Sequence, residues 1–392
     1  MSAVKTLRSV KIQAFIYSTQ MFTLLASAAI LSFQYELFML DRGVSLPIAL
    51  IIFSCGQVLM MTSNIAVRRF LDKIPDPIII LKIGIIIRTS TMLAMFFTTN
   101  AILFIILFLV YQTIAVSNII FESTTATWAF DNNISFSNMR LYGSFGFATA
   151  GFMVSFLYSL TGSLNFILLF LFCLNFYNLV IIFHSKGYKT SKKEKINENE
   201  EIKDVDKKLR SLIIMVAVTL AFSNAFNVIL NNHYRYFFHL TVEHAILMVS
   251  ISVLLGSFVA EIFGLKSVDF LTKKITPQKT IFVGILLSFF RWSISIFAPN
   301  YVGFALTYLF HGFCFAYLYM GCLAYAKENY GNQITKKAVL ELIIFMNLCG
   351  IIFVQLTNLV VELFNTHIVL FMYSAVSAIV VALFWFFYVK KV

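Results

Sequence analysis

Twelve long apolar stretches constrain the fold of this chain more than any other feature. A helix needs about 20 apolar residues to cross the hydrocarbon core of a membrane, and each stretch is of that length. The strands of a β-barrel would alternate at every second residue, and runs such as 102–110 do not. Only 12% of the residues are charged, against about 25% in a soluble domain. We therefore predict an all-α membrane protein. The predicted helices are 11–35, 45–66, 77–97, 100–125, 139–160, 164–184, 211–232, 243–264, 278–298, 301–325, 338–361 and 366–389.

The distribution of Lys and Arg predicts the orientation, because cytoplasmic loops carry an excess of basic residues. With the N-terminus inside, the outer loops hold only Arg42 and Arg235. We therefore expect a multi-pass protein of the cell membrane with both termini in the cytoplasm. The net charge of +12 then follows from topology. A nucleic-acid partner is not expected, since no soluble domain is large enough to present a basic face.

The chain has a single long polar segment, 185–210, which is rich in Lys, Glu and Asn. Its composition is typical of a mobile cytoplasmic tether rather than a folded domain. We therefore predict an N-terminal six-helix half at 1–184 and a C-terminal six-helix half at 211–392.

The two halves share a sequence echo. Residues 70–73, Phe-Leu-Asp-Lys, return as Phe-Leu-Thr-Lys at 270–273. Each copy leads into a span with an intramembrane arginine, Arg88 or Arg291, and we interpret Arg88 as structural or interfacial. With the tether, the echo favours parallel six-helix repeats, the arrangement of the major facilitator superfamily, whose members bind substrate near the midplane between the halves.

Glu122 and Arg140 form the strongest candidate site in the first half. A charge at membrane depth costs about 2.5–3.5 kcal/mol and marks a functional-site candidate. The planar guanidinium suits vicinal oxygens or a carboxylate, and a carboxylate accepts hydroxyl protons. Asn118 lies one turn before Glu122 on the same face, and Phe147 could stack on a sugar or nucleobase ring. The alternative is an ion pair that locks two helices together or closes the cytoplasmic side.

Glu261, Arg291 and His311 are the only acid, arginine and histidine deep in the spans of the second half. A carboxyl beside an arginine there could load and release a proton as access alternates, so we expect proton coupling at these residues. A structural network between three helices is the alternative. Asn224 and Asn227 share one face of the seventh span and are expected to bind substrate, although buried amides can also bridge helices.

Several segments resemble one branch of the major facilitator superfamily, that of lactose permease, its oligosaccharide–proton symporter relatives and the nucleoside–proton symporters. Residues 35–45 are similar to the segment after the first helix in that family, and 71–73 fall at its cytoplasmic loop motif. The spacing of Glu122 and Arg140 matches the essential pair of the sugar permease. The residues after Arg140 match its Gly, small residue, Gly and stacking Trp; they are Gly143, Ser144, Gly146 and Phe147.

In the second half, 259–261 resemble an acidic motif of the eighth helix, Arg291 an arginine of the ninth, and 311–316 a His-Gly segment of the tenth. The chain departs from the family pattern where Arg68 replaces the loop Gly and Phe147 the stacking Trp. Cys314 stands where the permease has the acid central to its proton coupling, which puts the coupling site in question.

These features predict a proton-coupled symporter that imports a small polar solute, a sugar, oligosaccharide or nucleoside, by alternating access. Its expected partners are the solute, protons and membrane lipid, and we expect a monomer. No cofactor, metal site or enzymatic activity is expected, since P-loop and Gly-x-Ser-x-Gly motifs are absent from the sequence. The alternatives are an exporter of drugs or amphipathic peptides, an uncoupled facilitator, and a membrane protein with a structural or sensory role. Against the exporter, residues 140–160 lack the proline of a Gly-x-x-x-Gly-Pro motif.

Overall fold

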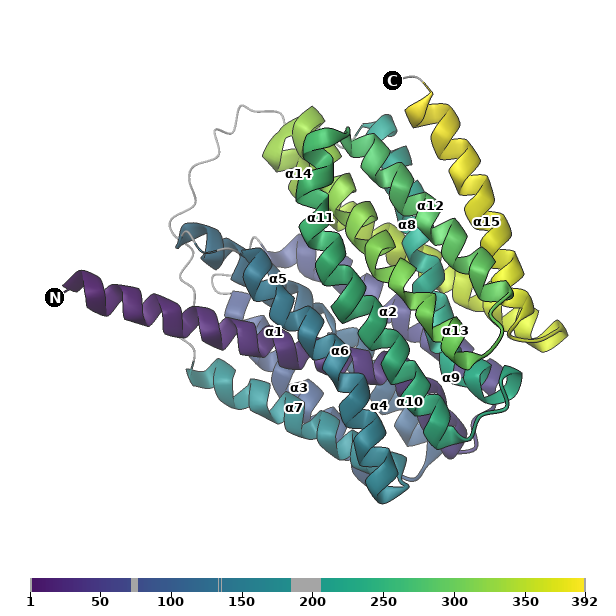
Figure 1. The fold of residues 1–392 in the computed structure, drawn as a ribbon. Helices are drawn as coiled ribbons and strands as arrows, with labels where there is room; N and C mark the ends of the chain where they lie inside the picture. The colour runs from purple at the N-terminus through teal and green to yellow at the C-terminus, as the bar shows by residue number, and fades with distance from the viewer. Residues whose placement is uncertain (1, 72–76, 133, 135, 185–205, 391–392) are drawn as a thin grey trace. The chain divides into compact units, whose positions relative to one another are not determined.

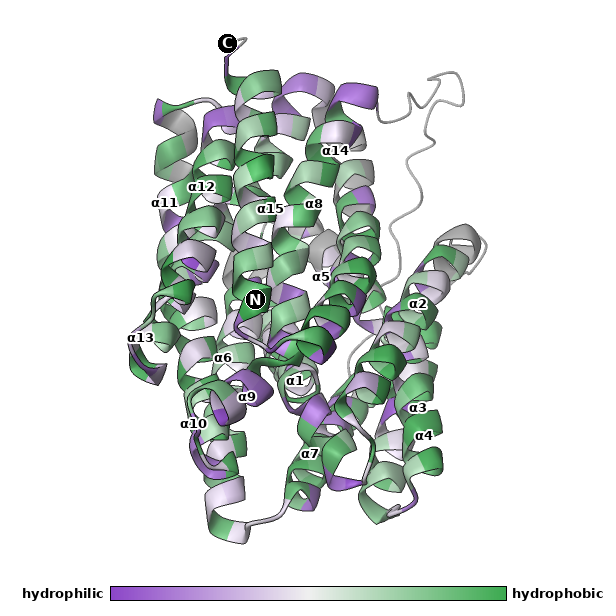
Figure 2. Cartoon of the chain, turned by 90° about the vertical axis from the view of Figure 1, so that its right-hand side faces the viewer, coloured by the Kyte–Doolittle hydropathy of each residue, from purple (hydrophilic) through white to green (hydrophobic). Residues whose placement is uncertain are grey.

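The computed structural model describes residues 2–71, 77–132, 134, 136–184 and 206–390, and these form helices joined by short turns (Figure 1). Across these ranges no strand is found. Twelve helical stretches are long and apolar enough to cross a membrane. Hydrophobic residues run along the helices, and hydrophilic residues gather near the helix ends (Figure 2). The predicted all-α membrane class is confirmed, and the chain is a multi-pass membrane protein.

The chain divides into two compact units, Met1–Asn197 and Glu198–Val392. The boundary falls within the predicted tether 185–210, of which 185–205 lie outside the described residues. The helices of the first unit are α1 (Ser2–Asp41), α2 (Leu46–Leu71), α3 (Pro77–Phe97), α4 (Ala101–Ile114), α5 (Val116–Asp131), α6 (Phe136–Thr161) and α7 (Leu164–His184).

In the first unit, α1 packs along α6 and α7. The contact with α6 is close enough that a Cβ at Gly146 would lie 2.1 Å from the carbonyl oxygen of Phe22. A glycine is therefore required at this crossing, as at close helix contacts in membranes generally. The core beside it is formed by Tyr17, Met21, Leu24, Leu81, Ile85, Phe121, Trp128, Ala129, Met139 and Ile182.

Within residues 206–390, the second unit contains three π-helical segments among its α-helices. Its elements are α8 (Lys207–Val228), α9 (Leu230–Asn232), η1 (His233–Phe237), α10 (Val242–Val253), η2 (Leu254–Ala260), α11 (Glu261–Lys274), α12 (Pro277–Ile296), α13 (Tyr301–Leu306), α14 (Tyr308–Leu363), α15 (Ile368–Phe384) and η3 (Trp385–Val389). Within α14 the helical conformation is interrupted at Gly331, whose φ of +82° is in the left-handed region. This residue therefore separates two spans.

Local sequence sets where several helices of this unit begin. The side chain of Asp206 accepts a hydrogen bond from the backbone N–H of Leu209 at 2.7 Å. This N-cap starts α8 at Lys207, before the predicted start at 211. Thr276 caps α12 in the same way, with Pro277 in its first turn, a position where proline is favoured.

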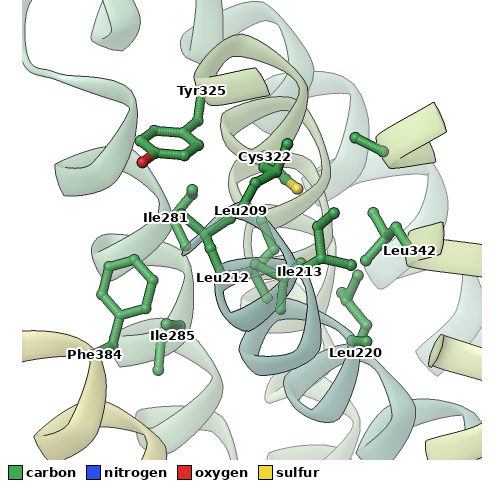
Figure 3. Packing of buried hydrophobic residues seen from close by; sticks show 14 of the residues in the cluster. Leu209, Leu212, Ile213, Leu220, Ile281, Ile285, Cys322, Tyr325, Leu342 and Phe384 are labelled. Atoms are coloured by element: carbon green, nitrogen blue, oxygen red, sulfur yellow. The ribbon is translucent and has the colours of Figure 1, made fainter. Parts of the chain in front are cut away.

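The core of the second unit is formed by side chains of α8, α12, α14 and α15, together with Tyr388 of η3 (Figure 3). Leu212 and Ile213 of α8 are fully buried, as are Ile281 of α12 and Leu342 of α14. Phe384 of α15 closes the cluster and is also fully buried. Apolar packing of this kind holds α8, α12, α14 and α15 together as one body.

A histidine is buried among aromatic rings beside the turn that follows α8 and α9. His233 is fully buried, and its Nδ1 lies 2.9 Å from the hydroxyl of Thr366. Its ring is parallel to that of Phe237 at 5.0 Å between centroids and meets Phe226 edge to face. Burial, with His367 close by, lowers the pKa of His233 to about 3.

Lowering the pH from 7 to 5 is expected to destabilise the protein by about 2 kcal/mol through His233. In the unfolded chain this imidazole has an ordinary pKa of about 6.5. Its contribution to stability is therefore complete above about pH 6.5 and is lost as the pH falls toward the folded value. Thermal unfolding in detergent should shift down by about 4–8 °C between the two pH values.

The control for this prediction is His244, which is exposed. His244→Gln should keep the wild-type pH dependence, whereas His233→Gln should reduce it. An unchanged pH dependence in H233Q would contradict the assignment.

Candidate functional site

The predicted pair Glu122 and Arg140 is formed. Nε of Arg140, on α6, lies 3.1 Å from Oε1 of Glu122, on α5, and the side chains are 30% and 44% exposed, respectively. An ion pair this accessible contributes only about 0–1 kcal/mol to stability. Among the described residues, the second carboxylate oxygen of Glu122 accepts from no other side chain, and the two Nη groups of Arg140 donate to none. The pair thus offers both acceptor and donor valences.

Glycines next to the pair leave room for it against α1. A Cβ at Gly143 would lie 2.4 Å from Leu25 and 3.1 Å from Nη1 of Arg140. Phe147, one turn further along α6, is half-buried and meets the ring of Phe33 edge to face at 5.6 Å. The ring of the predicted stacking residue therefore packs against α1.

Asn118 is anchored by Arg88, which the sequence indicates as a structural or interfacial residue. Its Oδ1 accepts a hydrogen bond from Nη1 of Arg88, and Arg88 also donates to the hydroxyl of Tyr111. The predicted fourth span 100–125 is present as one candidate span, Ala101–Glu122. Between these two acceptors it has a one-residue break at Ala115, where α4 ends at Ile114 and α5 begins at Val116, although φ and ψ of Ala115 stay in the right-handed helical region.

The second unit has a similar arrangement around Arg291, which is 2% exposed. Its Nη1 donates to the hydroxyl of Ser223 at 2.5 Å. Its guanidinium carbon lies 4.3 Å from the ring of Trp292 and 4.4 Å from that of Tyr308. Within the described residues Arg291 forms no ion pair with Glu261, so neutral groups and π-faces surround the charge.

Glu261 and His311 lie on segments that are in backbone contact. Glu261 begins α11 directly after η2, and π-helical segments are frequent at functional sites. A Cβ at Gly312 would lie 2.1 Å from the carbonyl oxygen of Gly256 and 2.5 Å from the backbone nitrogen of Glu261. His311, beside Gly312, packs against Tyr308 at 6.1 Å between ring centroids. Arg291, Tyr308 and His311 therefore form one chain of contacts.

The two predicted asparagines of α8 differ in their surroundings. Asn224 is exposed, whereas Asn227 is half-buried. Oδ1 of Asn227 accepts a hydrogen bond from Tyr308 at 3.3 Å. Asn227 thus belongs to the cluster of Arg291 and Tyr308, and Asn224 lies outside it.

The part of the chain that the structure describes contains no group of three or more His, Cys, Asp and Glu side chains placed to hold a metal. Its five cysteines are free thiols.

Residues 10–346 match the model of the MFS_1 like family, a family of the major facilitator superfamily. The chain belongs to this family. The predicted resemblance is therefore confirmed over nearly the whole chain, and the protein is a transporter of this superfamily. No curated protein matches the sequence.

Solved structures with the same fold have little sequence in common with this chain. The nucleoside transporter NupG aligns with a TM-score of 0.74 at 14% identity, covering 96% of this chain and 98% of that one. A D-xylose-proton symporter aligns with a TM-score of 0.73 at 11% identity, covering 95% and 96%. An auto-inhibited POT family peptide transporter aligns with a TM-score of 0.77 at 9% identity, covering 95% and 96%. At such identities the likeness shows the fold alone.

Sequence reasoning missed three residues that organise these clusters: Tyr111, Ser223 and Tyr308. Tyrosine and serine are common in spanning helices and carry no charge that would single them out. The repeated arginine of each half was the only available signal, because a buried guanidinium requires acceptors on neighbouring helices.

Proposed function

We propose that this transporter imports a small polar solute, a sugar, oligosaccharide or nucleoside, together with protons across the cell membrane. Both termini would lie in the cytoplasm, and the six-helix halves 1–184 and 211–392 would transport the solute by alternating access. The observation that carries the proposal is the accessible Glu122–Arg140 pair at 3.1 Å. An exposed ion pair that only joined two helices would add little to stability. A pair with unused hydrogen-bond donors and an unused acceptor is, in contrast, suited to bind vicinal hydroxyl groups.

The solute would bind to Glu122 and Arg140, with Asn118 and Phe147 at its sides and Asn224 and Asn227 contributed by α8. The nucleoside and xylose transporters of the same fold are consistent with such a solute. Half-burial of Phe147 leaves part of its ring available to stack. The guanidinium of Arg140 would set the orientation of the solute, because its donor groups lie in one rigid plane.

Proton coupling would depend on Glu261, Arg291 and His311. The support for this is their placement on three segments, α11, α12 and α14, that pack together. Glu261 follows a π-helical segment whose backbone contacts Gly312. A proton gained by Glu261 would change the charge at this contact and so favour reorientation. One proton moving down about 100 mV supplies about 2.3 kcal/mol, enough for roughly fifty-fold accumulation.

Proteoliposomes with an internal pH-sensitive dye test this proposal. Addition of uridine, D-xylose or lactose outside should acidify the lumen as solute enters with protons. Glu122→Gln should abolish uptake, and Glu261→Gln should remove the proton flux. Glu243→Gln, at an exposed acid in the first turn of α10, should leave both unchanged.

Other outcomes identify the competing functions. Uptake without any proton movement would indicate an uncoupled facilitator. Proton movement on addition of a drug or a dipeptide, but not of sugars or nucleosides, would replace the proposed solute class. Normal uptake in both the Glu122 and the Glu261 variants would overturn the assigned sites.

A further inference from the structure

Arg88 is a deeply buried charge of the first unit. It lies on α3 and is 1% exposed. Its guanidinium donates to Asn118 and Tyr111, and its carbon atom lies 4.5 Å from the centre of the Tyr111 ring. Within the described residues it pairs with no carboxylate. Burying a guanidinium costs several kcal/mol unless its donors are satisfied, so the two neutral acceptors are what hold this charge in place.

These two acceptors lie on opposite sides of the break in the fourth span. Tyr111 belongs to the last turn of α4, and Asn118 to the first turn of α5. At the break itself, the N–H of Ala115 bonds to the carbonyl oxygen of Gln112, and that of Asn118 to the carbonyl oxygen of Ala115. Such three-residue bonds tighten the chain locally. Arg88 therefore bridges the break.

Close packing of α3 against the start of α5 keeps this bridge in place. A Cβ at Gly84, one turn before Arg88, would lie 2.7 Å from Cβ of Ser117. Ser117 precedes Asn118 and is 1% exposed. The backbone of α3 thus approaches α5 at the residue next to Asn118, and the guanidinium has little freedom to leave it.

A related arginine–tyrosine contact occurs in the second unit. Arg291 of α12 lies 4.4 Å from the ring of Tyr308, the first residue of α14 after the break at Thr307. One turn later on α12, the hydroxyl of Ser295 donates to that of Thr307 at 2.9 Å. In both units the third spanning helix therefore places an arginine on a tyrosine beside a break in the fourth. This recurrence indicates a feature of the repeat rather than an incidental contact.

We propose that Arg88 is a positioning residue that fixes the hydrogen-bonding polarity of the solute site. Because Oδ1 of Asn118 accepts from Arg88, the amide is held in one orientation, in which its N–H groups are the part directed away from Arg88 and can donate to a solute. One turn later, Oε1 of Glu122 is occupied by Arg140 and the other oxygen remains an acceptor. The inference rests on the proposed binding role of the Glu122–Arg140 pair.

This polarity defines the class of solute more closely. A matching solute presents a hydroxyl hydrogen to Glu122 and, next to it, an oxygen that accepts from Asn118. Adjacent hydroxyl groups of a ribose or pyranose ring meet both requirements. An analogue that lacks one hydroxyl leaves a polar group of the site unpaired, and sites built in this way reject such analogues strongly.

The test compares uridine with 2′-deoxyuridine and 3′-deoxyuridine, and D-xylose with 2-deoxy-D-xylose, in proteoliposomes under an imposed proton gradient. Arg88→Gln releases the Asn118 amide, which can then rotate. We expect KM for the preferred solute to rise about 10-fold with little change in kcat, and the preference over the deoxy analogue to fall about 10-fold. Asn118→Asp keeps an acceptor for Arg88 but loses the donors, so it should reproduce both changes.

Tyr111→Phe is the matched control, since it removes the other acceptor of Arg88 but leaves the bond to Asn118. It should lower the thermal unfolding temperature and leave the analogue preference unchanged. A bracing role for Arg88 would make R88Q behave like Y111F, with an altered unfolding temperature and an unaltered preference, and this result would overturn the proposal.

Failure of the proposed function has a different signature. If the wild type neither binds nor transports any of these solutes, the solute class fails with the function. Hydrogen exchange of residues 115–122 then tests, independently of transport, whether Arg88 holds Asn118 in place. Faster exchange in R88Q than in Y111F would support it, and equal exchange would overturn it.

Discussion

Arg140→Lys is expected to lower kcat/KM for solute uptake about 10- to 150-fold. The lysine keeps the positive charge but replaces a planar fork of five donors with a single ammonium group. Each charge-assisted hydrogen bond that is lost costs about 1.5–3 kcal/mol, which corresponds to the stated range. Initial rates of uptake into proteoliposomes over a range of solute concentrations measure the effect.

The control is a second Arg–Glu pair at a comparable distance. Nη2 of Arg210, on α8, lies 3.2 Å from Oε1 of Glu341, on α14. Partly exposed ion pairs contribute only about 0–1 kcal/mol to stability. Arg210→Lys should therefore change kcat/KM less than about 3-fold. Equal losses in the two lysine variants would show that Arg140 acts as an ordinary structural ion pair.

Gly312→Ala is expected to destabilise the second unit by about 1–3 kcal/mol or more. The added Cβ would lie 2.1 Å from the carbonyl oxygen of Gly256 and 2.5 Å from the backbone nitrogen of Glu261. Both are backbone atoms, so the clash cannot be relieved by a side-chain rotation and α14 must separate from η2. Thermal unfolding in detergent measures the loss, and uptake should fall because Glu261 is displaced.

Gly350→Ala provides the comparison, in the second of the two spans of α14. Apart from the chain neighbours and the surrounding helix backbone, no atom lies within 4 Å of a Cβ built at Gly350, and replacing a helical glycine by alanine is stabilising by roughly 0.5–1 kcal/mol. The two substitutions are therefore expected to have opposite signs. Destabilisation by both would mean that α14 tolerates no alanine for reasons unrelated to the contact with η2.

The spanning helices and the Glu122–Arg140 pair could be predicted because both depend on information that is local in the sequence. Hydrocarbon thickness fixes the length of an apolar run, and the backbone satisfies its own hydrogen bonds within each helix. The pair joins two consecutive helices, α5 and α6, whose short connection brings their facing ends together. The functional roles of Glu122 and Arg140 remain predictions.

The contacts of Arg88, Arg291 and His233 could not be predicted. The bond from Arg88 to Asn118 joins α3 to α5, and the contact of Arg291 with Ser223 joins α12 to α8. His233 lies between the predicted spans 211–232 and 243–264, yet it is fully buried. In each case the partner lies on a helix that is distant in sequence, and no spacing rule relates the two.

The sequence by itself determined twelve spanning helices, because the apolar length of a segment decides whether it crosses a membrane. Tertiary structure alone decided where the fourth span breaks, which amide Arg88 holds and how η2 meets Gly312. The physical reason is that these features depend on side chains and backbones of helices packed against one another. Within a single apolar helix, nearly every residue is compatible with several such packings.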